Sequence, residues 1–249
     1  MIDILQRLGM IEILESAQRV CSTWWKVSHD PTMWRAIDLK YVPDVDSMFY
    51  VMCSRVLVKI CWIVVSSQLR YLRLVKCNIV ARSLTLAAKN FPLLEELHTH
   101  LTLITKEDIE SVGRYCPLLK SFTLNASECI VLGDSLSPDD GQALAIARSM
   151  PELRHLSLIL NALTNVGLQA ILVGCPQLVS LDLRHCNIDL ERDIGRRCRQ
   201  QIVDLKQPHA SCQYYEFDSE VCYYIYYWSS YDYDQDHDDG DMVTYSCWK

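Results

Sequence analysis

The chain has 249 residues, 50% of them hydrophobic, so it is long enough to bury a sizeable core. Its net charge of −7 arises at the C-terminal end, where residues 210–249 hold nine of the 31 acidic residues and one of the 24 basic residues. The remainder is close to neutral, and no apolar run approaches the ~18 residues of a membrane span. Composition therefore argues against a nucleic-acid or membrane partner.

The twelve cysteines are expected to be reduced thiols. No signal peptide precedes them, and several occupy repeated positions typical of small buried hydrophobes: Cys77, Cys116, Cys175 and Cys186. We therefore expect a cytoplasmic or nuclear protein, not a secreted one. No two cysteines are spaced C-x-x-C, and we expect neither a metal nor a cofactor.

Residues 1–40 are predicted to form a small helical unit. Asp30 followed by Pro31 is typical of a helix cap with proline in the first turn, and Trp34 and Ile37 follow it. Ahead of this cap, the apolar side chains with helical spacing are Ile4, Leu5, Leu8, Ile13, Leu14, Ala17, Val20, Cys21 and Trp24.

Residues 41–68 are predicted to be an irregular segment with a partial repeat. Residues 49–60 fit a helix, and residues 61–65 are predicted to be a buried strand. A return between parallel strands needs about a dozen residues, and Leu69 opens the next unit too soon for one. The sequence thus predicts that one repeat has lost its outer half.

Residues 69–207 repeat the pattern L-x-x-L-x-L, which is typical of leucine-rich repeats. Three of the four intervals between central apolar residues are 25 residues long, and the third is 34 because it carries an insertion. Helix starts are predicted at Thr105 with Asp108, and at Ser137–Pro138 with Asp140. The central residues are Leu72, Leu97, Phe122, Leu156 and Leu181.

This pattern predicts an α/β solenoid with a curved parallel sheet inside and helices outside. The polar residues between the leucines are expected to be exposed on the concave strand face and to bind a target protein. The predicted target-binding residues are Tyr71, Arg73, Glu96, His98, Ser121, Thr123, His155, Ser157, Ser180, Asp182 and Arg184.

Residues 208–249 form a tail rich in tyrosine and aspartate, predicted to be largely disordered. It is interpreted either as an acidic-aromatic interaction segment or as a solubilising end without a partner.

Two patterns resemble an esterase site and a metal site, but each lacks residues that such a site needs. Residues 133–136 spell GDSL, a serine-esterase signature, and residues 182–185 supply D-x-x-H, but Asp182 and His185 belong to the repeat register and the remaining esterase blocks are missing. His98 and His100 lack a third metal ligand at useful spacing. We expect no catalytic residue and no enzymatic activity.

The helical unit resembles an F-box, through Val20-Cys21-x-x-Trp24 and Asp30-Pro31-x-x-Trp34. With the repeats behind it, the chain resembles plant F-box/leucine-rich-repeat proteins over residues 1–205. An F-box usually opens with a Leu-Pro segment, whereas here Met1 falls inside the first helix, so we expect an N-terminally truncated F-box.

This resemblance implies a substrate receptor of an SCF-type ubiquitin ligase. The F-box would dock on a Skp-type adaptor, and through it on the cullin, while the repeats would hold the target. The implied adaptor-binding residues are Ile4, Leu5, Leu8, Ile13, Leu14, Val20, Cys21, Trp24, Pro31 and Trp34.

The alternative role for these apolar residues is to close the end of the solenoid core. In that case the chain would be a leucine-rich binding module that no longer reaches the ligase. A non-functional product of an eroded gene is a third interpretation.

Overall fold

Seven parallel strands, hydrogen-bonded in chain order, organise the described part of the chain. The computed structural model describes residues 8, 12–13, 16–40, 68–77, 83–125, 138–191, 193–211 and 215–217. The strands are β1 (Ala36–Lys40), β2 (Tyr71–Val75), β3 (Glu96–His100), β4 (Ser121–Asn125), β5 (His155–Ser157), β6 (Ser180–Asp182) and β7 (Asp204–Lys206).

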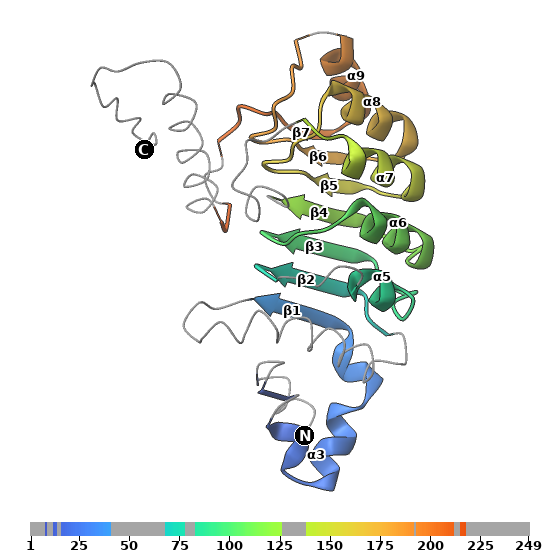
Figure 1. Cartoon of the computed structure of the whole chain (residues 1–249), viewed down its shortest axis with the longest axis vertical. Coiled ribbons are helices and arrows are strands. Elements are labelled where there is room, and N and C mark those ends of the chain that lie inside the picture. The colour runs from blue at the N-terminus through green and yellow to red at the C-terminus, as the bar shows by residue number, and fades with distance from the viewer. Residues whose placement is uncertain are drawn as a thin grey trace, which may run out of the picture. The chain divides into compact units, whose positions relative to one another are not determined.

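Helices return along one side of this sheet (Figure 1). They are α5 (Ser83–Ala88), α6 (Lys106–Tyr115), α7 (Gly141–Ser149), α8 (Asn165–Gly174) and α9 (Asp193–Gln201). The N-terminal elements are η1 (Ala17–Arg19), α3 (Ser22–Ser28) and η2 (Pro31–Trp34).

The chain divides into two units, Met1–Ser211 and Cys212–Lys249. In the second unit only residues 215–217 are described, where the Tyr215 ring meets the edge of Phe217 at 5.7 Å between centroids. The disorder predicted for the tail lies outside the described residues.

The predicted aliphatic ladder is confirmed. Leu72 pairs with Leu97, Leu97 with Phe122, and so on to Leu181, all in parallel register. Ile37 and Leu205 extend the ladder by one strand at each end. Because one repeat cannot bury its own apolar face, this alignment across neighbours forms the core.

The helices complete that core from outside the sheet. Ile109 and Val112 of α6, like Leu168 and Ile171 of α8, are at most 1% exposed. Buried side chains at this spacing hold each helix against the strands in front of it. The prediction of an α/β leucine-rich solenoid with helices on the outside is therefore confirmed.

Of the two predicted helix starts, the first is confirmed and the second differs. Thr105 and Asp108 form a capping box at the start of α6. Asp140 precedes α7 but makes no side-chain capping bond there. Its carboxylate instead accepts hydrogen bonds from Thr164 and Gly167 at the start of α8, so it joins two consecutive repeats.

The sheet begins earlier than predicted. Residues 36–40, expected within the helical unit, form β1 and pair with β2. This place beside β2 was expected for residues 61–65, which lie outside the described residues. Thirty residues separate β1 from β2, and residues 41–67, where the repeat without its outer half is predicted, lie outside the described residues, so it stays a prediction.

A left-handed residue recurs just after the strand of four repeats. Lys76, Leu101, Leu160 and His185 have φ between 52° and 59°. Each donates its N–H to a carbonyl of the next repeat, as Leu101 does to Asn125 at 3.0 Å. The conformation is costly for a residue with Cβ, and here it directs that N–H along the stack.

Candidate protein-binding surfaces

The N-terminal helical unit is held by short local bonds. The carboxylate of Asp30 accepts hydrogen bonds from the Thr32 N–H at 2.9 Å and the Thr32 hydroxyl at 2.7 Å, which lower the pKa of Asp30. Pro31 occupies the first turn of η2 as predicted, but the element is a 3-10 helix. This cap turns the chain from α3 toward the sheet.

Two residues predicted to contact the adaptor are buried in the core. Ile13 and Trp34 are 4% and 3% exposed, and the Trp34 indole donates to the Ser28 carbonyl at 2.8 Å. They share the core cluster with Met33 and with Ile37 of β1. In this structure both therefore join the helical unit to the solenoid.

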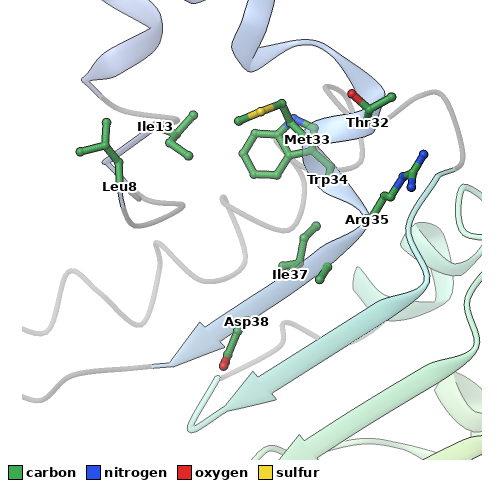
Figure 2. A pocket seen from close by; sticks show the side chains of 9 residues that line it. Leu8, Ile13, Thr32, Met33, Trp34, Arg35, Ile37 and Asp38 are labelled. Atoms are coloured by element: carbon green, nitrogen blue, oxygen red, sulfur yellow. The ribbon is translucent and has the colours of Figure 1, made fainter. Parts of the chain in front are cut away.

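A cavity of about 420 Å³ lies at this junction. Figure 2 shows Leu8, Ile13, Met33 and Trp34 around it, with Ile37 and Asp38 contributed by β1. Leu8 is half-buried and packs against the core.

Other predicted adaptor-binding residues remain accessible. Val20 is 63% exposed, Cys21 is exposed, and Trp24 and Pro31 are half-buried. Ile4, Leu5 and Leu14 lie outside the described residues. Trp25 was not predicted from the sequence, but it is 51% exposed and stacks on His29 with ring centroids 4.1 Å apart. The motif includes its neighbour Trp24 and not Trp25.

The strand face of the solenoid carries two mostly polar rows, and the register brings together all the predicted target-binding residues except Arg184, which follows β6. The first row runs through Ala36, Tyr71, Glu96, Ser121, His155, Ser180 and Asp204, and the second through Asp38, Arg73, His98, Thr123, Ser157, Asp182 and Lys206.

Cross-strand bonds order the first half of this face. Both carboxylate oxygens of Asp38 accept from Arg73, at 3.0 and 3.2 Å. The His98 ring lies between Glu96 at 3.2 Å and the Thr123 hydroxyl at 2.8 Å, and beside the Tyr71 ring at 5.2 Å. These side chains are therefore held in place before any partner arrives.

Three residues predicted to be exposed on this face are buried. Thr123, Asp182 and Arg184 are each 7% exposed. Arg184 donates to both carboxylate oxygens of Asp182, and Lys206 lies 3.5 Å from the same carboxylate. Arg184 follows β6 in a turn and folds back over Asp182, which removes both charges from the accessible face.

His100 is buried, whereas His98 beside it on β3 is half-buried. His100 lies at the end of β3, and desolvation, followed by the charges of Arg73 and His98, lowers its pKa to about 3. The residues that the structure describes contain no cluster of potential metal ligands. The GDSL stretch falls outside them.

The cysteines in the repeats behave as small apolar side chains. Cys116 and Cys175 each end a helix, and burial raises the pKa of Cys116 to about 12 and of Cys175 to about 11. A thiol held in its neutral form this strongly is a poor nucleophile. Within the described ranges, no helix has the length and apolar character to cross a membrane.

Parallel strands in chain order, returning helices and one shared aliphatic ladder define a leucine-rich-repeat solenoid. F-box/LRR-repeat protein 23 of Arabidopsis thaliana is 42% identical over 233 residues, covering 84% of this chain and 51% of that protein. F-box/LRR-repeat protein 22 is 38% identical over 231 residues, covering 83% and 74%. F-box protein SKIP19, also from Arabidopsis thaliana, is 38% identical over 232 residues, covering 84% and 74%.

The chain belongs to the plant F-box/leucine-rich-repeat family. It spans 51% of the first of these relatives and 74% of the other two. No family model matches the chain. The names of these relatives join an F-box to leucine-rich repeats, the two modules that the sequence of this chain predicts.

Proposed function

We propose that this protein is a substrate receptor of an SCF-type ubiquitin ligase. Its N-terminal helical unit binds a Skp-type adaptor, which connects it to the cullin, and the strand face of its repeats binds the protein to be ubiquitinated. One observation carries the proposal: the helical unit and the strand face of the repeats are joined through one core. Trp34 of the helical unit lies in the same core cluster as Ile37, which is the first residue of the ladder.

The chemistry of the strand face favours a protein target. Mixed hydroxyl, charged and aromatic groups at fixed positions match the composition of protein interfaces better than that of a buried small-molecule site. On this proposal the chain is not an enzyme, ubiquitin transfer belongs to other subunits, and the protein acts in the cytoplasm or nucleus without a cofactor.

The adaptor interaction is tested with a purified Skp-type adaptor by titration calorimetry. We expect Val20→Asp to abolish binding, because it places a charge in an exposed apolar position of the helical unit. Val173→Asp is the matched control, because Val173 is 60% exposed on α8 of the solenoid. Equal loss in both variants would contradict a specific role for the helical unit.

The alternative is a leucine-rich binding module that does not reach the ligase. The burial of Ile13 and Trp34 favours it, because these residues already serve the core. Wild-type protein that binds no Skp-type adaptor, while it still captures a target, would support this alternative.

Target binding is tested by cross-linking in plant extract. We expect Glu96→Arg and His155→Glu, both exposed on the strand face, to change the captured proteins. Arg148→Glu, exposed on α7, is the control that keeps the strand face intact. An unchanged set in the strand-face variants would contradict this part of the proposal.

A further inference from the structure

We propose that the edge of the strand face where the strands begin binds an extended acidic-then-apolar segment of the target protein. This inference rests on the proposed function, since it names the chemistry that the receptor would recognise. It is carried by seven residues, called here the entry row, each of which lies just before a strand: Arg35, Arg70, Glu95, Lys120, Arg154, Val179 and Val203.

The backbone of the entry row is hydrogen-bonded from one repeat to the next. Each residue after Arg35 donates its N–H to the carbonyl of the preceding row member, at 2.8 to 3.0 Å. The side chains therefore occupy one equivalent position in consecutive repeats, about 4.8 Å apart, which is the spacing of hydrogen-bonded strands.

The middle of the row carries unneutralised positive charge. Glu95 forms an ion pair with Arg70, so its carboxylate is already engaged on the side away from Lys120. Lys120 and Arg154 are exposed, and neither forms an ion pair with any residue that the structure describes. His155, next to Arg154, is also exposed. The Lys120 and Arg154 cations form a site for carboxylates.

The end of the row is apolar. Val179 is 41% exposed and Val203 is 86% exposed, and the two are adjacent through the Val203 N–H bond to the Val179 carbonyl at 3.0 Å. Covering these two exposed valines removes apolar surface from water, which stabilises a complex with an apolar partner residue. The row therefore changes from cationic to apolar within four repeats.

This order sets the pattern of the partner. Lys120 and Val203 are three strand spacings apart, about 14 Å, and alternate residues of an extended peptide are about 6.7 Å apart on one face. A segment crossing the strands therefore places acidic residues at two successive alternate positions over Lys120 and Arg154, and an apolar residue at the third over the valines.

The surrounding charges orient this segment. Asp204 follows Val203 and accepts a hydrogen bond from Ser180 at 2.9 Å, so the apolar end of the row is flanked by a negative charge. An acidic segment is thus repelled from the valine end and attracted at Lys120, which selects one direction of binding.

The probe is a fluorescein-labelled serine peptide with two glutamates on alternate residues, followed two residues later by leucine. Binding to the full chain is measured by fluorescence anisotropy. We expect Lys120→Glu with Arg154→Glu to weaken binding by about tenfold or more, and added salt to weaken wild-type binding. Val203→Ser is expected to weaken it by a few-fold because it removes apolar contact.

Matched controls separate these effects from general charge or stability. Arg114→Glu with Arg148→Glu makes the same charge change at exposed positions of α6 and α7, and Val173→Ser makes the same apolar change on α8. Both controls are expected to bind the peptide like wild type. Absence of wild-type binding, equal loss in the controls, or equal binding of a peptide with glutamine for glutamate would overturn the inference.

The two proposals fail separately. If the peptide does not bind but Glu96→Arg still changes the proteins captured from extract, the entry row is wrong and target binding by the strand face stands. If neither is observed, target binding by this face is wrong as well.

Discussion

His100 shows how the solenoid constrains a single titratable group. It ends β3 at 9% exposure, and its pKa is lowered from 6.5 to about 3, first by desolvation and then by the charges of Arg73 and His98. The folded protein thus holds a neutral imidazole over a pH range in which the unfolded chain binds a proton. Stability from this group is complete above pH 6.5 and declines as the pH falls toward 3.

We therefore expect the free energy of unfolding to fall by about 2 kcal/mol between pH 7 and pH 5 because of His100, since each pH unit below its unfolded pKa costs about 1.4 kcal/mol. Urea unfolding at the two pH values measures this for wild type and for His100→Gln. The variant should lose correspondingly less stability on acidification. Parallel losses in the two proteins would show that His100 does not titrate as described.

Residue burial was the part of the site that the sequence predicted least well. Alternation along a strand correctly placed Glu96 and His98 on the accessible face. It failed at Asp182, because alternation gives the direction of a side chain and not what covers it. The Arg184 guanidinium covers that carboxylate from the turn after β6. The period of two placed both residues on one face but did not predict that they pair with each other.

At the scale of elements, the ladder of central apolar residues makes each strand depend on its neighbours. Leu181 is fully buried between Leu156 and Leu205. Leu181→Asp should cost about 3–5 kcal/mol, because it leaves a hole and buries a charge. Chemical denaturation measures the loss, with Val179→Asp as a control at a 41% exposed position of the same repeat. A similar loss in both variants would mean that the ladder is not what makes Leu181 essential.

Asp140 is one of the carboxylates that bond consecutive repeats on the outer side, as Asp108 does through Thr85. The Asp140 carboxylate accepts from the Thr164 N–H and hydroxyl, both at 2.7 Å, and from the Gly167 N–H at 3.0 Å. Asp140→Ala leaves the start of α8 without these charged acceptors and should cost about 2–3 kcal/mol.

The adjacent Asp139 provides the control for this prediction. It accepts one hydrogen bond, from the Gly141 N–H at 2.9 Å, and it is exposed. Asp139→Ala should therefore cost no more than about 1 kcal/mol. If thermal melting ranks the two variants in the opposite order, Asp140 does not join the repeats as its bonds indicate.

The sequence predicted the elements that repeat and missed those that do not. Five copies of one pattern were enough to establish register, because the same slot recurs on each strand. Residues 36–40 alternate as a strand should, with Ile37 and Leu39 buried, but a strong helical pattern precedes them and obscured the boundary. The left-handed residues after the strands were not predictable, because none of the four is glycine.

At the scale of the whole molecule, one core crosses from the helical unit into the repeats. Ile13, Trp34 and Ile37 belong to the same cluster as Leu72 and Leu181. A solenoid whose terminal strand is uncovered exposes its ladder to water, so a cap of different structure is needed at each end. The helical unit covers the β1 end. On the proposed function, this unit therefore stabilises the solenoid with its buried residues and binds the adaptor with its exposed ones.

Two tryptophans separate these roles. Trp34 is buried, whereas Trp25 is 51% exposed and contacts the His29 ring. Trp34→Ala should destabilise the chain by about 3–5 kcal/mol, because it opens a cavity in the shared core. Trp25→Ala should change stability by less than about 1 kcal/mol and, on the proposed function, should weaken binding to a Skp-type adaptor by tenfold or more.

Thermal melting and adaptor titration on both variants test this division. Each measurement serves as the control for the other. Trp25→Ala must keep the melting temperature of wild type while its affinity for the adaptor falls, and Trp34→Ala must have a lower melting temperature than wild type. If Trp25→Ala retained full adaptor affinity, the contact would lie elsewhere in the helical unit. If Trp34→Ala melted like wild type, the two modules would be independent, because a cavity at their junction would then cost the solenoid nothing.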